Sequence, residues 1–480
     1  MMNAEELLKF CCERSRTMRE SLENGEMALA DFIHLQADKV RKNRDIKPLL
    51  DPEDFYRRTE EFALERLGSE KAREVGAAVR LGAMMTADHH GGIYCAQTFQ
   101  ADLIYAEILK ELGNETALVP VMSGGQVELD SSTYARGICL HLTGRQMERF
   151  PFFSSRPAAR TAYAAPAVGE EMVKRFYGMV KESGLSENDK AGLSELVKEV
   201  YECDEVKGSS AFEDQVTRAG AVLSKKLFGE DGPVLAYLEA ERLNAPILAK
   251  EISEKRTPLS RLFSDERASW LMKNIKQSDG APVTDILFKA LDKKGRKINL
   301  SLNEDRMLRG RDWEGNDIAF PADPEKLTEL ILNQSLIPGF FLIACSCFFE
   351  RGITWFGGVF QTEYLPEWQQ MFADLLSGLG MKSEAETVRK YDCSGYVCGP
   401  MFALYGTDDF ANVAGPVEFM IRKTGTGRLR EMMENISLRD AHLIGISEMF
   451  ADLTRPDERP EGWYEKIGRE LKELFPENIL

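Results

Sequence analysis

The segment 79–122 constrains the fold of this chain more than any other. A short apolar run at 79–85 is followed by a polar, glycine-containing turn at 86–92. From 97 to 112 the apolar residues recur at helical spacing, and 117–122 is again a continuous apolar run. Strand, turn, helix and strand in this order predict a βαβ unit, and therefore a parallel sheet with a right-handed crossover.

The remainder of the chain divides into helical and α/β stretches. Charged helix formers dominate the beginning, the middle and the end of the sequence, whereas strand-like runs gather in two blocks. These textures predict one α/β core with a parallel sheet, interrupted by a helical insertion and flanked by helices. The predicted segments are a helical N-terminal segment at 1–78, the first half of the core at 79–165, the helical insertion at 166–275, a hairpin and the second half of the core at 276–405, and a helical C-terminal segment at 406–480.

The second block predicts elements of its own. The runs 285–291 and 296–302 flank the sequence Asp-Lys-Lys-Gly, which is typical of a hairpin turn. The apolar run 336–349 is too short for a membrane span and predicts a buried strand with its flanks. A further strand is predicted at 353–361, followed by a helix from about 366 to 379.

Composition and charge narrow the class of protein. The chain has 480 residues, 43% of them hydrophobic and 29% charged, and 61 basic against 78 acidic residues give a net charge of −17. This composition predicts a folded soluble protein, and the acidic balance argues against broad nucleic-acid binding. The N-terminus lacks the features of a signal peptide, and the nine cysteines include no C-x-x-C pair. We therefore expect a cytoplasmic protein with reduced thiols and no membrane contact.

The turn at 86–92, Thr-Ala-Asp-His-His-Gly-Gly, is the strongest candidate for a site. In open α/β sheets, ligands bind at the carboxyl ends of strands, where the N-terminus of the next helix attracts anions. Glycines let the backbone approach a phosphate, and an imidazole can donate a hydrogen bond to developing negative charge. The residues expected to bind a nucleotide or phosphorylated ligand are Thr86, Asp88, Gly91, Gly92 and Gln97, with His89 and His90 as candidate catalytic residues.

A second polar stretch follows the strand at 117–122 and is expected at the same edge of the sheet. It offers Gln126, Glu128 and Arg136 as candidate substrate-binding residues. Asp130 lies among them and is a candidate catalytic carboxylate, because it can hold or deprotonate an amine.

Three other interpretations of the turn stay open at this stage. Asp88-His89-His90 is also the triplet of a class of phosphoesterases that bind divalent metals through Asp and His, although the partner motifs of that class are missing. A single metal ion held by Asp88, His89, Cys95 or Asp130 is the second interpretation. The third is a polar turn in which Asp88 caps the next helix and the histidines are solvated. A ligand-binding turn without a metal is favoured over all three.

The order of the segments resembles that of the cysteine-adding enzymes of bacillithiol biosynthesis, a family of Rossmann-like ligases. That family has Thr-Gly-Gln-Gln-x-Gly where this chain has the turn at 86–92, and a helix and a Val-Pro-Val strand, here at 119–121, follow. The hairpin, the apolar run and the stretch 355–364 then come in the family's order. The turn is also similar to the His-x-Gly-His turn of class I aminoacyl-tRNA synthetases, in which histidines stabilise phosphate charge.

The resemblance implies a Rossmann-like core and a second group of site residues. In the cysteine-adding family a Gly-Gly-x-x-Glu-x-x-Tyr element closes the active-site region. The corresponding residues here are Gly357, Gly358, Gln361, Glu363 and Tyr364. Glu363 is thereby a second candidate catalytic carboxylate, and the other four are candidate substrate-binding residues.

Together these features predict a ligase or transferase that joins an amine or amino acid to a phosphorylated or nucleotide-activated metabolite. His89 and His90 would stabilise charge, and Asp130 or Glu363 would hold or deprotonate the amine. ATP or ADP, with Mg²⁺, are the candidate cofactors, the expected partner is a small-molecule substrate, and a homodimer is left open. The alternatives are a non-catalytic nucleotide- or metabolite-binding protein and a metal-dependent phosphoesterase.

Overall fold

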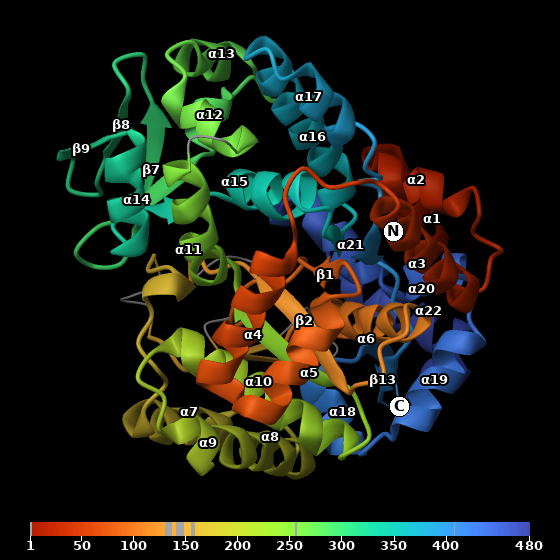
Figure 1. The fold of residues 1–480 in the computed structure, drawn as a ribbon. Helices are drawn as coiled ribbons and strands as arrows, with labels where there is room; N and C mark the ends of the chain where they lie inside the picture. The colour runs from red at the N-terminus through yellow and green to blue at the C-terminus, as the bar shows by residue number, and fades with distance from the viewer. Residues whose placement is uncertain (1, 130–136, 141–147, 155–158, 255–256, 408) are drawn as a thin grey trace.

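A five-stranded, all-parallel sheet forms the centre of the molecule (Figure 1). The computed structural model describes residues 2–129, 137–140, 148–154, 159–254, 257–407 and 409–480. The strands of the sheet lie in the order β5 (Val234–Glu239), β2 (Leu118–Ser123), β1 (Ala83–Met85), β11 (Thr354–Gly358) and β12 (Tyr396–Cys398). Counted by their order along the chain, these strands read 3-2-1-4-5, the strand order of the doubly wound Rossmann-like fold. The predicted fold class is therefore confirmed.

Successive residues of β1 pack into two different hydrophobic cores. Ala83 and Met85 belong to one core together with helix α6 (Ala96–Glu111), whereas Met84 belongs to the other together with α16 (Gln361–Gly378). Because side chains alternate along a strand, the two cores lie on opposite faces of the sheet. The helix that follows β1 and the helix that follows β11 therefore run on opposite faces.

Helices cover both faces of the sheet. The helices before β1 are α1 (Ala4–Arg14), α2 (Arg16–Leu22), α3 (Leu29–Arg44), α4 (Glu53–Leu67) and α5 (Ser69–Val79). The elements between β2 and β5 are the antiparallel pair β3 (Gly137–Leu140) and β4 (Glu148–Pro151), followed by η1 (Ala162–Ala164), α7 (Glu170–Glu182), α8 (Glu187–Tyr201), α9 (Asp204–Lys207) and α10 (Phe212–Phe228). The helices after β5 are α11 (Ala240–Ser253), α12 (Pro258–Ser264) and α13 (Ala268–Asn274).

A second, antiparallel sheet lies beside the parallel one, at the upper left of Figure 1. It follows η2 (Val283–Asp285) and consists of β10 (Ile337–Pro338), β6 (Phe288–Leu291), β7 (Lys297–Leu302), β8 (Met307–Arg311) and β9 (Asp317–Pro321), with α14 (Pro324–Leu332) after β9. The elements towards the C-terminus are α17 (Lys382–Val388), the hairpin β13 (Leu404–Gly406) and β14 (Ala411–Val413), α18 (Pro416–Arg422), α19 (Thr426–Glu434), α20 (Leu438–Ile444), α21 (Ile446–Leu453), η4 (Pro456–Glu458), α22 (Trp463–Leu474) and η5 (Pro476–Asn478).

The elements predicted around the first turn are confirmed, and so is the hairpin of β6 and β7. Three predictions need correction, and the third concerns the start of α16. The stretch 166–275 is mainly helical but also supplies β5, which pairs with β2 along its whole length. The run 336–349 is not a strand: after the short β10 it forms α15 (Phe340–Ala344) and a π-helical turn at Cys345–Glu350. An apolar run buried on all sides carries no periodicity that separates a strand from a helix.

Helix α16 begins earlier than its proline indicates. The backbone amides of Glu363 and Tyr364 donate to the carbonyl oxygen of Phe360 at 3.1 and 3.3 Å, so a first turn forms ahead of Pro366. The N-terminus of α16 consequently lies directly at the end of β11. None of the helices in the described part of the chain combines the length and apolar character needed to cross a bilayer.

A buried ion network joins three distant segments behind the parallel sheet. The guanidinium of Arg351, which follows the π-helical turn, donates to both carboxylate oxygens of Asp54 in α4, each at 2.7 Å. It also pairs with Glu251 in α11. The Arg351 side chain is buried, so its charge depends on these two partners rather than on water.

Replacing Arg351 tests how much this network contributes. We expect Arg351→Met to lower the free energy of unfolding by about 3–5 kcal/mol, because two carboxylates then lose their buried partner. The matched control is Arg311→Met, which removes an exposed ion pair with Asp317 and should change stability little. Urea denaturation of both variants gives the comparison, and equal losses would contradict the prediction.

Candidate functional site

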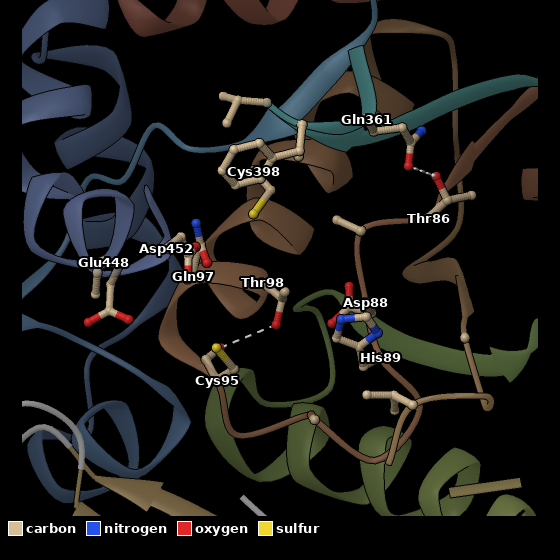
Figure 2. Close-up of a pocket in the computed structure, with 18 of the residues that line it drawn as sticks. Thr86, Asp88, His89, Cys95, Gln97, Thr98, Gln361, Cys398, Glu448 and Asp452 are labelled. Atoms are coloured by element: carbon tan, nitrogen blue, oxygen red, sulfur yellow. Dashed lines mark hydrogen bonds between the residues drawn. The ribbon is translucent and has the colours of Figure 1, made fainter. Parts of the chain in front are cut away.

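A cavity of about 1150 Å³ opens at the carboxyl ends of β1 and β11 (Figure 2). Its lining comes from the turn after β1, the first turn of α6, the loop after β2, the start of α16, and the segment around α21. The residues that line it are Thr86, Ala87, Asp88, His89, Gly92, Cys95, Gln97, Thr98, Gly124, Gln126, Val127, Arg149, Lys297, Phe340, Gly358, Val359, Phe360, Gln361, Tyr364, Cys398, Glu448, Ala451, Asp452, Thr454, Arg455, Pro456 and Arg459.

The position of the cavity follows from the strand order. The chain leaves β1 towards one face of the sheet and leaves β11 towards the other, so the two connections part between neighbouring strands. Such a switch point leaves a crevice at the carboxyl ends of the strands, which is where open α/β sheets bind ligands. The N-termini of α6 and α16 both begin at this crevice, and each presents backbone N–H groups that no helical carbonyl satisfies.

A hydrogen bond between Thr86 and Gln361 links the connection from β1 to α6 with the connection from β11 to α16. The Thr86 hydroxyl donates to Gln361 Oε1 at 2.9 Å, and the Thr86 amide donates to the carbonyl oxygen of Phe356 in β11 at 2.7 Å. Gln361 folds back against Gly357, where a Cβ atom would lie 2.1 Å from Gln361 Oε1. Gly357 therefore serves the site by leaving room for the glutamine.

The turn after β1 continues alongside the end of β2. The Gly124 amide donates to the carbonyl oxygen of Asp88 at 2.9 Å, and the His90 amide donates to the carbonyl oxygen of Gly124 at 2.8 Å. Gly91 then takes a φ of 98°, in the left-handed region that favours glycine, and the chain turns towards α6. These backbone bonds hold the side chains of the turn in fixed directions.

The two neighbouring histidines point to different places. His89 lines the cavity, whereas the imidazole of His90 is fully buried. His90 Nδ1 lies 2.6 Å from the Ser123 hydroxyl, and Nε2 donates to the carbonyl oxygen of Glu213 at 3.1 Å. Burial lowers the pKa of His90 to about 3, so its ring is neutral. His90 therefore holds the turn in place and does not reach the cavity.

Asp88 is the most deeply buried acid of the cavity lining. Only 2% of the residue is exposed, and burial raises its pKa to about 6, although the side chains of Asp102 and Thr98 favour the charged form. Asp102, in α6, is itself fully buried and accepts a hydrogen bond from the Tyr237 hydroxyl at 2.8 Å. Burial and the neighbouring Asp88 carboxyl raise the pKa of Asp102.

Helix α21 supplies a second pair of acids, Glu448 and Asp452, four residues apart on one face. Burial raises the pKa of Glu448 to about 8 and that of Asp452 to about 6, while Arg459 opposes both shifts. The side chain of Gln97, in the first turn of α6, hydrogen-bonds Asp452. Figure 2 shows Gln97 beside Asp452 and shows Glu448 on the same helix.

Four cationic side chains also line the cavity. Arg149 comes from β4, Lys297 from the start of β7, and Arg455 and Arg459 from the segment after α21. Lys297 lies 3.7 Å from the carboxylate of Glu128, which itself is outside the lining. Among the described residues, the cavity thus combines three acids, of which Asp88 is buried, with basic residues drawn from three separate parts of the chain.

The structure brings together most, but not all, of the predicted site residues. Those that line the cavity are Thr86, Asp88, His89, Gly92, Gln97, Gln126, Gly358, Gln361 and Tyr364. Those outside the lining are His90, Gly91, Glu128, Gly357 and Glu363. Glu363 accepts a hydrogen bond from the Ser15 hydroxyl at 2.9 Å and so binds α16 to the N-terminal helices. Asp130 and Arg136 lie outside the described residues.

The Asp-His-His triplet does not converge on one point, because His90 turns inward. Within the described ranges, no group of three or more His, Cys, Asp and Glu side chains is arranged to hold a metal ion. All nine cysteines are free thiols. Burial raises the pKa of the Cys95 thiol, which lines the cavity, to about 12, so this thiol stays protonated and is a poor nucleophile.

The acids of α21 and the four basic residues were not anticipated from the sequence. Glu448 and Asp452 carried a usable signal, since a spacing of four places both carboxylates on one face of a helix whose other residues are largely apolar. Arg149 and Lys297 carried none, because each is one charged residue among many in a polar strand.

The contrast between the two histidines is testable. We expect His90→Ala to lower the free energy of unfolding by about 2–4 kcal/mol, since it leaves a cavity and removes the partners of Ser123 and Glu213. His89→Ala, its matched control, should change stability by less than about 1 kcal/mol. Urea denaturation measures both, and a larger loss for His89→Ala would contradict the assignment.

Glu448 should give stability a distinctive pH dependence. Its pKa in the folded chain, about 8, lies above its ordinary value of 4.5, so the folded state holds a proton that the unfolded state releases between these values. Stability therefore falls as pH rises through this window, by up to about 1.4 kcal/mol per pH unit. We expect Glu448→Gln to become more stable relative to wild type from pH 5 to pH 8 in denaturation series. A difference that stays constant with pH would contradict the prediction.

Comparisons with known proteins do not assign a function to this chain. No protein-family model matches the chain, and no curated protein matches it either. The residues that line the cavity are thus the observations from which a function is inferred.

Proposed function

We propose that this chain is a small-molecule transferase or ligase that joins an amine, such as an amino acid, to a phosphorylated or nucleotide-activated metabolite. The observation that carries the proposal is the combination of charges in the cavity at the switch point. Basic side chains and two helix N-termini suit an anionic group, and buried acids suit an amine. One ligand of a single charge type would leave half of this lining without a partner.

The anionic substrate is expected near the helix N-termini and the basic residues. The helix dipole gives each N-terminus a partial positive charge, and α6 and α16 begin at the same cavity. Lys297, Arg149 and Arg455 add full positive charges that can reach phosphate oxygens. Gly92 has no side chain to keep a phosphate away from the start of α6.

The size of the cavity favours two substrates. Pockets for one drug-sized molecule measure about 300–1,000 Å³, and this cavity reaches about 1150 Å³. Phe360, 39% exposed at the start of α16, offers a ring on which a nucleobase could stack. ATP or ADP, with Mg²⁺ bound through its phosphates, therefore fits the lining and is the nucleotide we expect.

The proposed joining reaction has three requirements. Amide formation needs an unprotonated amine, an activated acyl group and stabilisation of the charge that develops on oxygen. His89 and the N-termini of α6 and α16 lie at the cavity, which supports a role as donors to that oxygen. Acids in the lining support a role in holding the amine, whereas Glu363 lies outside the lining and accepts a hydrogen bond from Ser15.

Ligand-dependent melting tests the proposal directly. We expect ADP, ATP with Mg²⁺, or both to raise the Tm, because a ligand that binds only the folded state stabilises it. Lys297→Ala should weaken nucleotide binding by about tenfold, as expected for loss of one charged contact. The matched control is Lys294→Ala, in the hairpin turn outside the lining, which should bind as wild type does.

The outcomes separate the candidate functions. Stabilisation by Mn²⁺ or Zn²⁺ but by no nucleotide or phosphorylated metabolite would contradict the proposal and favour a metal-dependent phosphoesterase. Nucleotide binding without turnover of any amine, in assays of ADP or AMP release with mixed amino acids, would instead indicate a binding protein.

A further inference from the structure

Two carboxyl groups, one in the cavity lining and one buried behind it, interact with each other. Asp88 comes from the turn after β1, and Asp102 from the second turn of α6. The two side chains interact directly. Asp88 is 2% exposed and Asp102 is fully buried, so only the Asp88 carboxyl is in contact with the cavity.

Charged donors are missing from the groups that affect this pair. Besides each other, the titratable groups that act on Asp88 or Asp102, or are affected by them, are Tyr237 in β5, Tyr105 in α6 and Cys398. Apart from the interactions with Asp102 and Thr98 that favour its charged form, neither oxygen of Asp88 receives a hydrogen bond from the described residues. The carboxyl that reaches the cavity thus retains its capacity to accept hydrogen bonds.

Two buried carboxyls in contact cannot both carry a charge, so the pair holds one proton at neutral pH. The hydroxyl of Tyr237 donates to Asp102 Oδ2 and favours the charged form of Asp102, but burial and the Asp88 carboxyl outweigh it and raise the pKa of Asp102. Asp102 is the more buried of the two and has no contact with the cavity. The proton therefore belongs on Asp102, where it can bridge to Asp88, and the charge belongs on Asp88.

We propose that Asp88 binds the ammonium group of the amine substrate and accepts one of its protons, and that Asp102 is the positioning residue that holds the proton shared by the pair. This inference rests on the proposed function, because the amine comes from it. In the step, one N–H bond of the ammonium breaks, its electron pair stays on nitrogen, and an O–H bond forms on Asp88. The neutral amine is then the nucleophile.

Asp88 is better suited to this role than the acids of α21. Glu448 and Asp452 both lie in the field of Arg459, which partly satisfies their charge. Asp452 also accepts from Gln97 and is exposed at the cavity mouth. Asp88 has no cation beside it, so an incoming ammonium would be its only counter-charge among the described groups.

Infrared spectroscopy locates the proton without any ligand. At pH 7.5 Glu448 also contributes a protonated carboxyl. A further C=O band of the wild-type spectrum should be absent from Asp102→Asn and present in Asp88→Asn. Asp88 itself should give a second band that titrates near pH 6 and is absent from Asp88→Asn. If the band at pH 7.5 disappears in Asp88→Asn and persists in Asp102→Asn, the proton lies on the wrong partner and the proposal fails.

A further variant keeps this assignment falsifiable if Asp102→Asn does not fold. Tyr237→Phe removes the hydrogen bond to Asp102 while keeping the ring. The band at pH 7.5 should shift in this variant, because the Asp102 carbonyl loses its donor. An unshifted band would assign the protonated carboxyl to another residue and overturn the proposal.

A pair of small probes tests the amine. The probe 2-aminoethyl phosphate carries a phosphate and a primary ammonium, and phosphocholine carries the same phosphate with a nitrogen that has no N–H. We expect the first to raise the Tm of wild type more than the second, and the difference to vanish in Asp88→Asn but persist in the control variant Asp317→Asn, at an exposed position outside the lining. Equal effects of the two probes on wild type, or none, would refute the role of Asp88. The Tm is also measured with nucleotide. A rise with nucleotide would support the proposed function even if the probes refute the role of Asp88.

Discussion

The site depends on one constraint: the connections that follow the neighbouring strands β1 and β11 leave the sheet towards opposite faces. These two strands pair in parallel, from Ala83 opposite Thr354 to Met85 opposite Phe356, yet their following helices go to opposite faces of the sheet. The backbone beyond the strand ends therefore cannot close over itself, and a crevice remains. The hydrogen bond from Thr86 to Gln361 joins the first residue after β1 to the first residue of α16 and so links the two connections.

The net charge of the chain and the local charges of the cavity act on an anionic ligand in opposite directions. A net charge of −17 repels anions at long range, so any attraction for a phosphate must come from groups within a few ångströms. The cavity provides these groups through two helix N-termini and four basic side chains. A buried carboxylate without a counter-charge costs free energy. A cationic ligand bound beside Asp88 would reduce this cost.

Local patterns in the sequence were enough to predict the first βαβ unit and the turn at its centre. The polar turn, the helical spacing and the apolar run all lie within one short segment, so no distant information was needed. The third strand was hidden because Glu239 at the end of β5 is followed at once by helix formers, with no glycine or proline to mark the boundary. The direction of a side chain was equally out of reach: His89 and His90 are adjacent and chemically identical, and only Ser123 and Glu213 decide which one is buried.

The contribution of α21 to the cavity has a consequence for how this protein becomes competent to bind. The acids on α21 and the arginines after it face a turn that is made near the beginning of the chain, and α21 is held there by the N-terminal helix α1, through the contact of Phe10 with Phe450. During synthesis the Rossmann-like strands leave the ribosome before this helix does, because β12 ends at Cys398 and α21 begins at Ile446. A ligand that contacts both the turn after β1 and α21 would bind only molecules in which α21 has docked. Its binding would therefore shift the folding equilibrium towards the fully folded state.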